Sequence, residues 1–288
     1  MPLLAVPNVS EGRDPAAIEA IGAAFAAGAR LLDTHSDPDH HRSVFTLAAE
    51  PGALAGALVA GAREALARVD MRRHEGAHPC VGALDVAPVV HLDGAARGAA
   101  CAEALVAADD LARELELPAF LYGALGGGRT RAELRRGGLA ELTGRMASGE
   151  LRPDFGPPQP HPSGGVALVA ARPPLVAFNV ELAAPATLDD ARVVASAIRE
   201  GGARGLPGLR ALGLWLEDRG AAQVSCNVED PRATPLAAVV EAVRAHAAVE
   251  AAELVGLAPR AALESFPADV PLRGFDPARH VIENALGL

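Results

Sequence analysis

The run Asp154-Phe155-Gly156-Pro157-Pro158-Gln159-Pro160-His161-Pro162-Ser163-Gly164-Gly165 separates two parts of this 288-residue chain that show a similar order of elements. Its four prolines and three glycines are incompatible with a regular helix or strand. The run therefore predicts either a loop or a connector between two lobes, and the residues on its two sides decide the fold.

The part of the chain before this run predicts a β-α-β-β-α-β order, the split βαβ motif. Asp14 is the expected N-cap of the first helix, and Pro15 suits its first position. A basic stretch and one more helix then lead into the run. The expected elements are a strand at 3–6, a polar turn at 7–12, a helix at 15–27, strands at 30–33 and 43–48, a helix at 51–69, a strand at 86–92, a helix at 95–115 and a strand at 119–122.

The part after the run predicts the same order again. Strands are expected at 166–170, 175–181, 211–216, 222–228 and 251–257, with helices at 187–200 and 235–247. We therefore predict an α/β (α+β) fold of two similar split-βαβ, ferredoxin-like lobes with mixed sheets, residues 1–174 and 175–288. A ligand is expected in a cleft between the lobes.

Composition restricts the class of protein. Hydrophobic residues make up 50% of the chain and aromatic residues only 3%, which indicates globular cores built from small aliphatic side chains. A net charge of −10 argues against a nucleic-acid-binding surface. No apolar run approaches the ~20 residues of a spanning helix, and residues 1–7 do not resemble a signal peptide. Three cysteines without a CxxC pair favour a reducing cytoplasm.

Five of the nine histidines lie between His35 and His78, in two polar segments. We interpret the first segment, 33–42, as a polar loop between two predicted strands. A calcium loop built on Asp33, Asp37 and Asp39 is conceivable, but the glycine and the final glutamate of such a loop are missing. Arg42 lies beside the following strand and could hold a substrate carboxylate in a two-pronged contact. A solvated hairpin tip is expected for Asp37, Asp39 and His40.

The second segment, 72–80, contains the pattern H-E-x-x-H at His74, Glu75 and His78. On a helix this pattern binds zinc, but Gly76 and Pro79 oppose a helix here, so no metal is expected. A loop that presents His78 for proton transfer is favoured, with Glu75 or Asp85 orienting the ring. Solvated loop histidines and a zinc site remain as alternatives.

Two further features have ordinary explanations. The run Gly126-Gly127-Gly128-Arg129 is not followed by G-K-[ST], so it predicts a flexible turn and not a phosphate loop. Cys80 lies close to His78 and could be an activated thiol, although a bystander cysteine is the more common case.

Several of these motifs together resemble the glutamate formimidoyltransferase family, the transferase half of formimidoyltransferase-cyclodeaminase. They occur in the family's order over nearly the whole chain. The matching stretches are Val6-Pro7-Asn8-Val9-Ser10-Glu11-Gly12, His41-Arg42-Ser43-Val44, 70–79 with His74-x-Gly76-x-His78-Pro79, Gly82-Ala83-Leu84-Asp85-Val86, Leu121-Tyr122-Gly123, Pro153-Asp154-Phe155-Gly156-Pro157, Ala177-Phe178-Asn179-Val180, Ala222-Gln223-Val224-Ser225 and Leu254-Val255-Gly256-Leu257.

The resemblance implies that the chain moves a formimino group from N-formimino-L-glutamate to N5 of tetrahydrofolate, in a folate tunnel between two similar lobes. It implies that His78 is the catalytic residue and that tetrahydrofolate is a co-substrate. It also implies small-molecule partners, a homodimer, and no membrane partner. The implied substrate-binding residues are Asn8, His35, His41, Arg42 and Cys80, and the implied folate-binding residues are Gly156, Pro157, Pro158, Gln159, Pro160, His161, Pro162, Ser163, Gly164 and Gly165.

The chain departs from the family pattern at three of these positions. Cys80 stands where relatives usually have arginine, His41 where they usually have asparagine, and His35 near an expected acidic residue. A thiol cannot replace a guanidinium. Two alternatives therefore accompany the formimino transfer: a hydrolase or transferase for another amidine or formyl donor, and a folate-binding protein with impaired catalysis.

Overall fold

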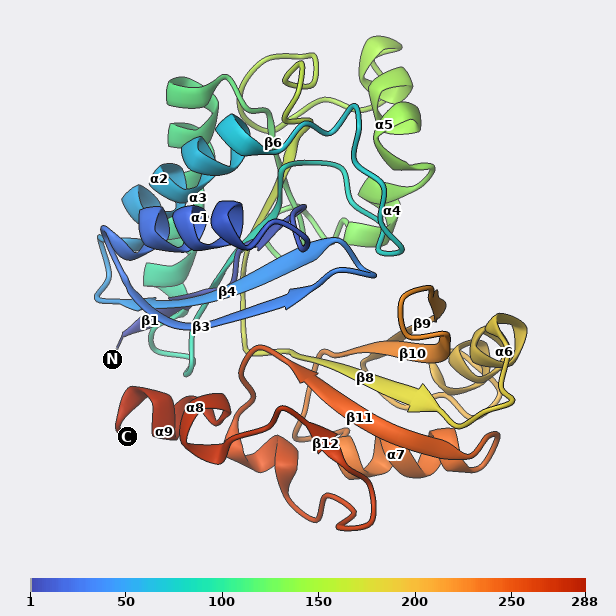
Figure 1. The fold of residues 1–288 in the computed structure, drawn as a ribbon. Coiled ribbons are helices and arrows are strands. Elements are labelled where there is room, and N and C mark those ends of the chain that lie inside the picture. The colour runs from blue at the N-terminus through green and yellow to red at the C-terminus, as the bar shows by residue number, and fades with distance from the viewer. Residues whose placement is uncertain (1) are drawn as a thin grey trace. The chain divides into compact units, whose positions relative to one another are not determined.

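The computed structural model describes residues 2–288, which divide into two compact units, one ending at Pro173 and the other running from Pro174 to Leu288. Each unit contains a mixed β-sheet with helices packed on it (Figure 1). The expected mixed α/β class is therefore confirmed. Over residues 2–288, no helix is both long and apolar enough to cross a membrane.

The sheet of the first unit extends the split βαβ motif. Strands β1 and β2 both lie between β4 and β5, like one interrupted strand, and β3 pairs with the far side of β4. These pairings are antiparallel, whereas β7 joins β5 and β6 in parallel. The elements are β1 (Leu3–Ala5), β2 (Asn8–Val9), α1 (Pro15–Ala26), β3 (Arg30–Asp37), β4 (Arg42–Ala49), α2 (Leu54–Arg68), β5 (Leu84–Val90), α3 (Arg97–Leu115), β6 (Ala119–Leu121), α4 (Arg131–Arg135), α5 (Gly138–Ala147) and β7 (Ala167–Arg172).

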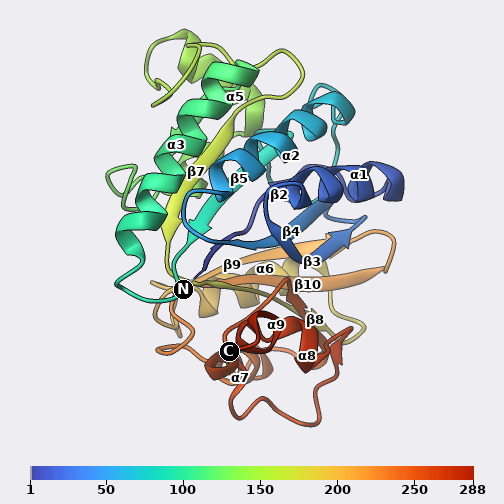
Figure 2. The same cartoon turned by 90° about the vertical axis from the view of Figure 1, so that its left-hand side faces the viewer.

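Helices cover both faces of this sheet, but not equally. The long helices α1, α2 and α3 bury one face, where the Phe25 and Phe45 ring centroids lie 5.2 Å apart (Figures 1 and 2). On the opposite face, α4 and α5 pack over β5, β6 and β7 around Phe120, Leu134 and Leu142. Among residues 2–288, strands β3 and β4 contribute no residue to this second core.

The second unit repeats the motif with one added strand. Its sheet has the order β12-β11-β8-β10-β9, in which β8 to β11 pair in antiparallel fashion and β12 pairs with β11 in parallel. The elements are β8 (Val176–Leu182), α6 (Leu188–Ile198), β9 (Leu209–Leu216), β10 (Ala221–Val228), α7 (Leu236–Arg244), β11 (Val249–Val255), the 3₁₀ helix η1 (Arg260–Leu263), β12 (Leu272–Arg273), α8 (Pro277–His280) and α9 (Ile282–Leu286).

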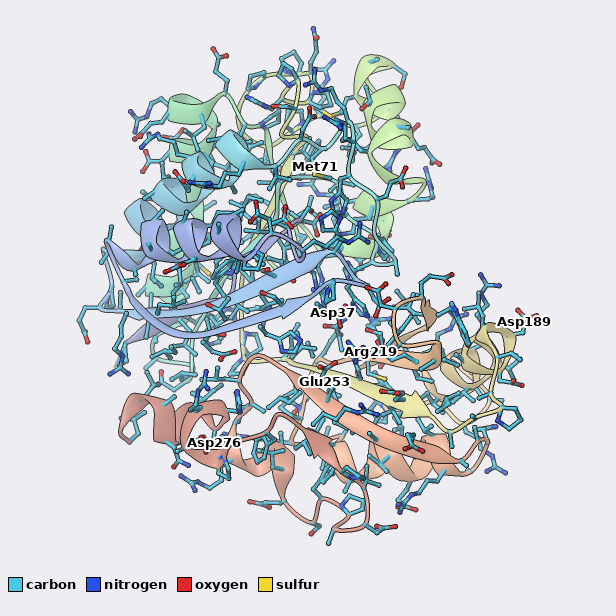
Figure 3. The ribbon with its side chains drawn as sticks, in the orientation of Figure 1. Asp37, Met71, Asp189, Arg219, Glu253 and Asp276 are labelled. Atoms are coloured by element: carbon cyan, nitrogen blue, oxygen red, sulfur yellow. The ribbon has the colours of Figure 1, made fainter. Side chains whose placement is uncertain are left out.

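Helix starts were predictable from side chains that satisfy free backbone N–H groups. Asp14 caps α1 by accepting from the amides of Ala16 and Ala17, and Pro15 is its first residue, as expected. In α6, Thr187 and Asp190 form a reciprocal capping box. Asp189 also lies in the first turn of α6, where a carboxylate is favourable (Figure 3).

Two predicted boundaries are wrong. The expected turn at 7–12 contains strand β2, because Asn8 and Val9 pair with both β4 and β5. The expected loop at 33–42 begins as strand: β3 continues to Asp37, and only 38–41 form the turn. Polar side chains on both faces hide the strand's alternation, in which Asp33 and Asp37 are buried and Thr34 and Ser36 are exposed.

The run 154–165 is irregular, as predicted, but it is not the connector between lobes. It lies within the first unit, and β7 follows it in the first sheet. The chain passes from one unit to the next at Pro173 and Pro174.

Two glycines of α2 should respond to alanine substitution with opposite signs. A Cβ at Gly61 would lie 2.1 Å from ring atoms of Phe25, whereas a Cβ at Gly56 would meet nothing within 4 Å. We expect Gly61→Ala to lower the free energy of unfolding by about 1–3 kcal/mol through overpacking. Gly56→Ala should raise it by about 0.5–1 kcal/mol through helix propensity. Urea unfolding followed by circular dichroism measures both, and equal effects would contradict the packing described here.

Candidate active site

The hairpin tip, residues 38–41 between β3 and β4, is the first component of the site. Asp37 pairs with Arg42 across the hairpin, and Asp37 Oδ1 accepts from the His40 amide at 2.8 Å (Figure 3 labels Asp37). His41 has a positive φ of 49°. The tip was expected to be solvated, and this is wrong: the exposed fractions of Asp37, Asp39 and His40 are 4%, 7% and 1%.

The histidine loop, residues 74–78, covers the tip and explains this burial. The Ala77 amide donates to the Asp39 carbonyl at 3.1 Å. Gly76 lies so close to the tip that a Cβ there would be 2.6 Å from the His40 carbonyl oxygen. Gly12 makes a similar approach from the other side, since its Cβ would lie 2.3 Å from the Asp37 carbonyl oxygen.

The histidine loop is irregular and contains no helix, so H-E-x-x-H does not form the zinc-binding helix considered above. Within residues 2–288, no group of three or more His, Cys, Asp or Glu side chains is arranged to hold a metal ion. The loop conformation favoured from Gly76 and Pro79 is confirmed.

His41 ties the loop to the tip through its ring. Nδ1 lies 2.8 Å from the Glu75 carbonyl oxygen, and Nε2 lies 3.3 Å from Glu11 Oε1. The ring also stacks on His74, with centroids 4.4 Å apart and planes inclined by 24°. Both ring nitrogens and one ring face of His41 therefore contact other residues of the chain.

His78 stacks on His40, with ring centroids 5.9 Å apart and planes inclined by 21°. The residue is half-buried, and its Nδ1 is buried without a hydrogen-bond partner among residues 2–288. Burial lowers the pKa of His78 well below 6.5, and the positive charges of Arg42 and Arg135 lower it further. The ring is therefore neutral at pH 7.

Neither carboxylate expected to orient His78 does so. Asp85 Oδ1 accepts from the Val81 amide at 2.8 Å, and Asp85 Oδ2 pairs with Arg135 in a buried ion pair. Glu75 is exposed, and its contribution is the backbone carbonyl that binds His41. The prediction failed because Asp85 is close to His78 in sequence but pairs in the fold with Arg135, a cation from a distant helix.

Three arginines surround His78. Burial lowers the pKa of Arg42 to about 10, with Arg135 and Arg131 adding to the effect and Asp85 and Asp37 opposing it. Arg131 and Arg135 lie one helical turn apart on α4. Asp85 compensates Arg135, so the cluster keeps an excess of positive charge around His78.

Sequence reasoning missed the arginines of α4 and Tyr122. The Arg131 guanidinium carbon lies 5.8 Å from the centroid of the Tyr122 ring, a cation–π geometry. The Tyr122 hydroxyl is buried with no hydrogen-bond partner within the described chain. The i, i+4 spacing of Arg131 and Arg135 was the available signal, but a short basic helix is more often a solvated one.

Asn8, His35 and Arg42 lie on one face of the sheet. Val44 of β4 pairs with His35 on one side and with Asn8 on the other, so these side chains form a row across three strands. Arg42 lies two residues before Val44, on the same face. The Asn8 side-chain amide donates to the Val6 carbonyl at 3.0 Å. This face is opposite to that of Phe45, which packs under the long helices.

Cys80 is half-buried beside Ser10, whose hydroxyl donates to the Gly82 carbonyl at 2.7 Å. Burial raises the pKa of Cys80 to about 11, and the Asp85 carboxylate adds to the rise. The thiol is therefore protonated at neutral pH, which opposes a nucleophilic role.

The run 156–165 folds back toward the segment that follows His78. His161 and Gly165 exchange backbone hydrogen bonds of 2.8 and 3.0 Å, and the Gly164 carbonyl accepts from Ala83 at 2.9 Å. A Cβ at Gly165 would lie 2.2 Å from the Val81 carbonyl oxygen. With α5, the run borders a hollow of about 750 Å³ lined by Arg72, Leu139, Thr143, Met146, Ala147 and 158–162.

Comparison with known proteins identifies similar domains. Residues 3–172 match the family described as the formiminotransferase domain, N-terminal subdomain, and residues 177–267 match the formiminotransferase domain. The chain is 34% identical over 292 residues to a glutamate formimidoyltransferase of Streptococcus pyogenes serotype M1, covering 98% of this chain and 97% of that protein.

Two more relatives agree with this. A glutamate formimidoyltransferase of Thermoplasma acidophilum is 33% identical over 285 residues, covering 94% of this chain and 93% of the relative. The formimidoyltransferase-cyclodeaminase of Rattus norvegicus is 35% identical over 273 residues, covering 90% of this chain. The chain spans about half the length of that relative.

The protonation of Cys80 can be tested by alkylation. Because its pKa is about 11, we expect its reaction with iodoacetamide to accelerate about tenfold per pH unit from pH 7 to 9, without levelling. A small free thiol, with a pKa of about 8.5, should begin to level over the same interval. Mass spectrometry of the Cys80 peptide gives the rate. Fast labelling that no longer depends on pH above 8 would restore the nucleophile hypothesis.

Proposed function

This chain belongs to the formiminotransferase family, and from that premise we propose that it transfers the formimino group of N-formimino-L-glutamate to N5 of tetrahydrofolate, with His78 as acid and base. One observation carries the assignment of His78. It is a neutral, half-buried imidazole whose Nδ1 is out of water, held among arginines that suit an anionic substrate.

The reaction exchanges one amine for another on an amidine carbon. N5 of tetrahydrofolate attacks that carbon, and His78 accepts the proton that N5 loses. The tetrahedral intermediate then collapses: the bond from the carbon to the glutamate nitrogen breaks, and His78 returns the proton to that nitrogen. The products are N5-formimino-tetrahydrofolate and glutamate. One imidazole can serve both steps because it is neutral at the start and neutral at the end.

The arginine cluster explains how a histidine with a low pKa becomes an effective base. Formimino-glutamate carries two carboxylates, and we propose that Arg42 binds one of them through two parallel hydrogen bonds. The carboxylates offset the positive charges that depress the pKa of His78. The pKa then rises toward neutral in the complex, where proton transfer is required.

The remaining predicted site residues divide by position. We propose that Asn8, His35 and Cys80 line the donor site, because Asn8 and His35 share a sheet face with Arg42 and Cys80 follows His78 closely. We propose that residues 156–165 contact the folate. Their hollow against α5 and their backbone contacts with 81–83 support this role. His78 is not among the residues that line this hollow, so only part of the folate would occupy it.

We also propose a cytoplasmic homodimer. Free Cys80, Cys101 and Cys226 are consistent with a reducing compartment. The dimer rests on the family resemblance, and light scattering of the purified chain measures it.

Replacing His78 by alanine should remove transfer while leaving substrate binding. Loss of a general acid–base group lowers turnover by about 10²–10⁴-fold, and we expect a fall in kcat of that order. A spectrophotometric assay with formimino-glutamate and tetrahydrofolate measures it, with His91→Ala as the control. Full activity of His78→Ala would refute the assignment. Donor turnover in the absence of folate would favour a hydrolase, and folate binding with no turnover by the wild type would favour a binding protein.

The pH dependence should differ between the free enzyme and the complex. Because His78 acts as a base only when neutral, activity is lost as pH falls through its pKa. We expect the acid limb of kcat/KM, which reports the free enzyme, well below pH 6.5, and the acid limb of kcat at higher pH. Arg42→Gln removes one cation and should move the kcat/KM limb upward. Coincident limbs in the wild type would contradict the electrostatic argument.

A further inference from the structure

The His41 ring contacts two other segments of the chain. Its two nitrogens face two oxygens, the Glu75 carbonyl at 2.8 Å and Glu11 Oε1 at 3.3 Å. A carbonyl oxygen can only accept a hydrogen bond, so Nδ1 donates to the Glu75 carbonyl. The ring therefore joins the histidine loop to the segment that precedes α1.

The groups that contact His41 are themselves fixed. Glu11 Oε1 accepts from the amides of Arg13 and Asp14 at 2.7 and 3.0 Å. Arg13 lies at the same tip, where its Nε donates to the Pro38 carbonyl. The His74 ring, which belongs to the histidine loop, stacks on His41 with centroids 4.4 Å apart.

The contacts of His41 connect its ring to His78. Glu75 and Ala77, which bind the tip at His41 and Asp39, belong to the same five-residue loop as His78. His78 in turn stacks on His40, the tip residue next to His41. Movement of the loop away from the tip would therefore displace the His78 ring from its neighbours.

We propose that His41 is a positioning residue that clamps the histidine loop to the hairpin tip and so fixes His78 for proton transfer. This inference rests on the proposed function of His78. The clamp predicts that loss of the His41 side chain loosens the loop and slows turnover.

The experiment compares His41→Ala and His41→Asn with a matched control, His91→Asn. His91 also has Nδ1 at 2.8 Å from a backbone carbonyl, that of Asp93, but in a different loop. The first readout needs no substrate. Hydrogen exchange followed by mass spectrometry should show faster exchange of the 74–78 peptides in His41→Ala and no change in the control.

The second readout is kinetic. A loosely held catalytic group reacts more slowly while substrates still bind, so kcat of His41→Ala should fall by about 10- to 100-fold with KM for the donor unchanged. His41→Asn keeps a side-chain hydrogen-bond donor that can reach the Glu75 carbonyl. This variant should therefore keep part of the activity that His41→Ala loses.

Three outcomes would overturn the inference. Unchanged exchange at 74–78 in His41→Ala would show that His41 does not hold the loop, whether or not the chain is a transferase. A raised KM with unchanged kcat would place His41 in contact with substrate instead. Activity of His41→Asn no higher than that of His41→Ala would show that the hydrogen bond to the Glu75 carbonyl does not hold the site. If the wild type turned over no donor, the proposed function would fail while the exchange result still decided the clamp.

Discussion

The close approach of three backbone segments at the end of the β3–β4 hairpin is the constraint on which the site depends. Gly12 and Gly76 lie so near the hairpin backbone that a Cβ at either position would be 2.3 or 2.6 Å from a carbonyl oxygen. Such distances exclude any larger side chain without movement of the backbone. Because the histidine loop can pack this closely on the hairpin, the tip is buried, and the rings of His40 and His78 stack.

Burial at the hairpin tip changes the pKa of the residues that lie there. An exposed histidine near arginines would be screened by water, but His78 lies where desolvation and the charges of Arg42 and Arg135 act in the same direction on its pKa. Asp85 compensates the charge of Arg135 in a buried ion pair. This pairing limits the cost of placing several arginines together, since an uncompensated buried charge is strongly destabilising. The same positive charge suits an anionic ligand, whose negative charge would offset the charges that lower the pKa of His78.

Much of the fold was predictable because its signals are local. Asp14 with Pro15 marks the start of α1, and alternating aliphatic residues mark β8 and β10. The errors occurred where tertiary contacts decide: β3 extends through a polar stretch because β4 fixes its register, and Asp37 and His40 are buried by a loop more than thirty residues away. For the site, Gly76 and Pro79 correctly indicated a loop around His78. The arginines of α4 could not be found in this way, since a pairing with Asp85 across fifty residues leaves no pattern in the sequence.

The strands of the split βαβ motif have the same order in both units, but one connection within the motif differs in length. In the first unit the link from α2 to β5 runs over residues 69–83, and in the second the equivalent link from α7 to β11 runs over 245–248. Fifteen residues thus stand in one copy of the motif where four suffice in the other. The longer passage contains the histidine loop, 74–78, and the shorter passage of the second unit has no room for a segment of that kind.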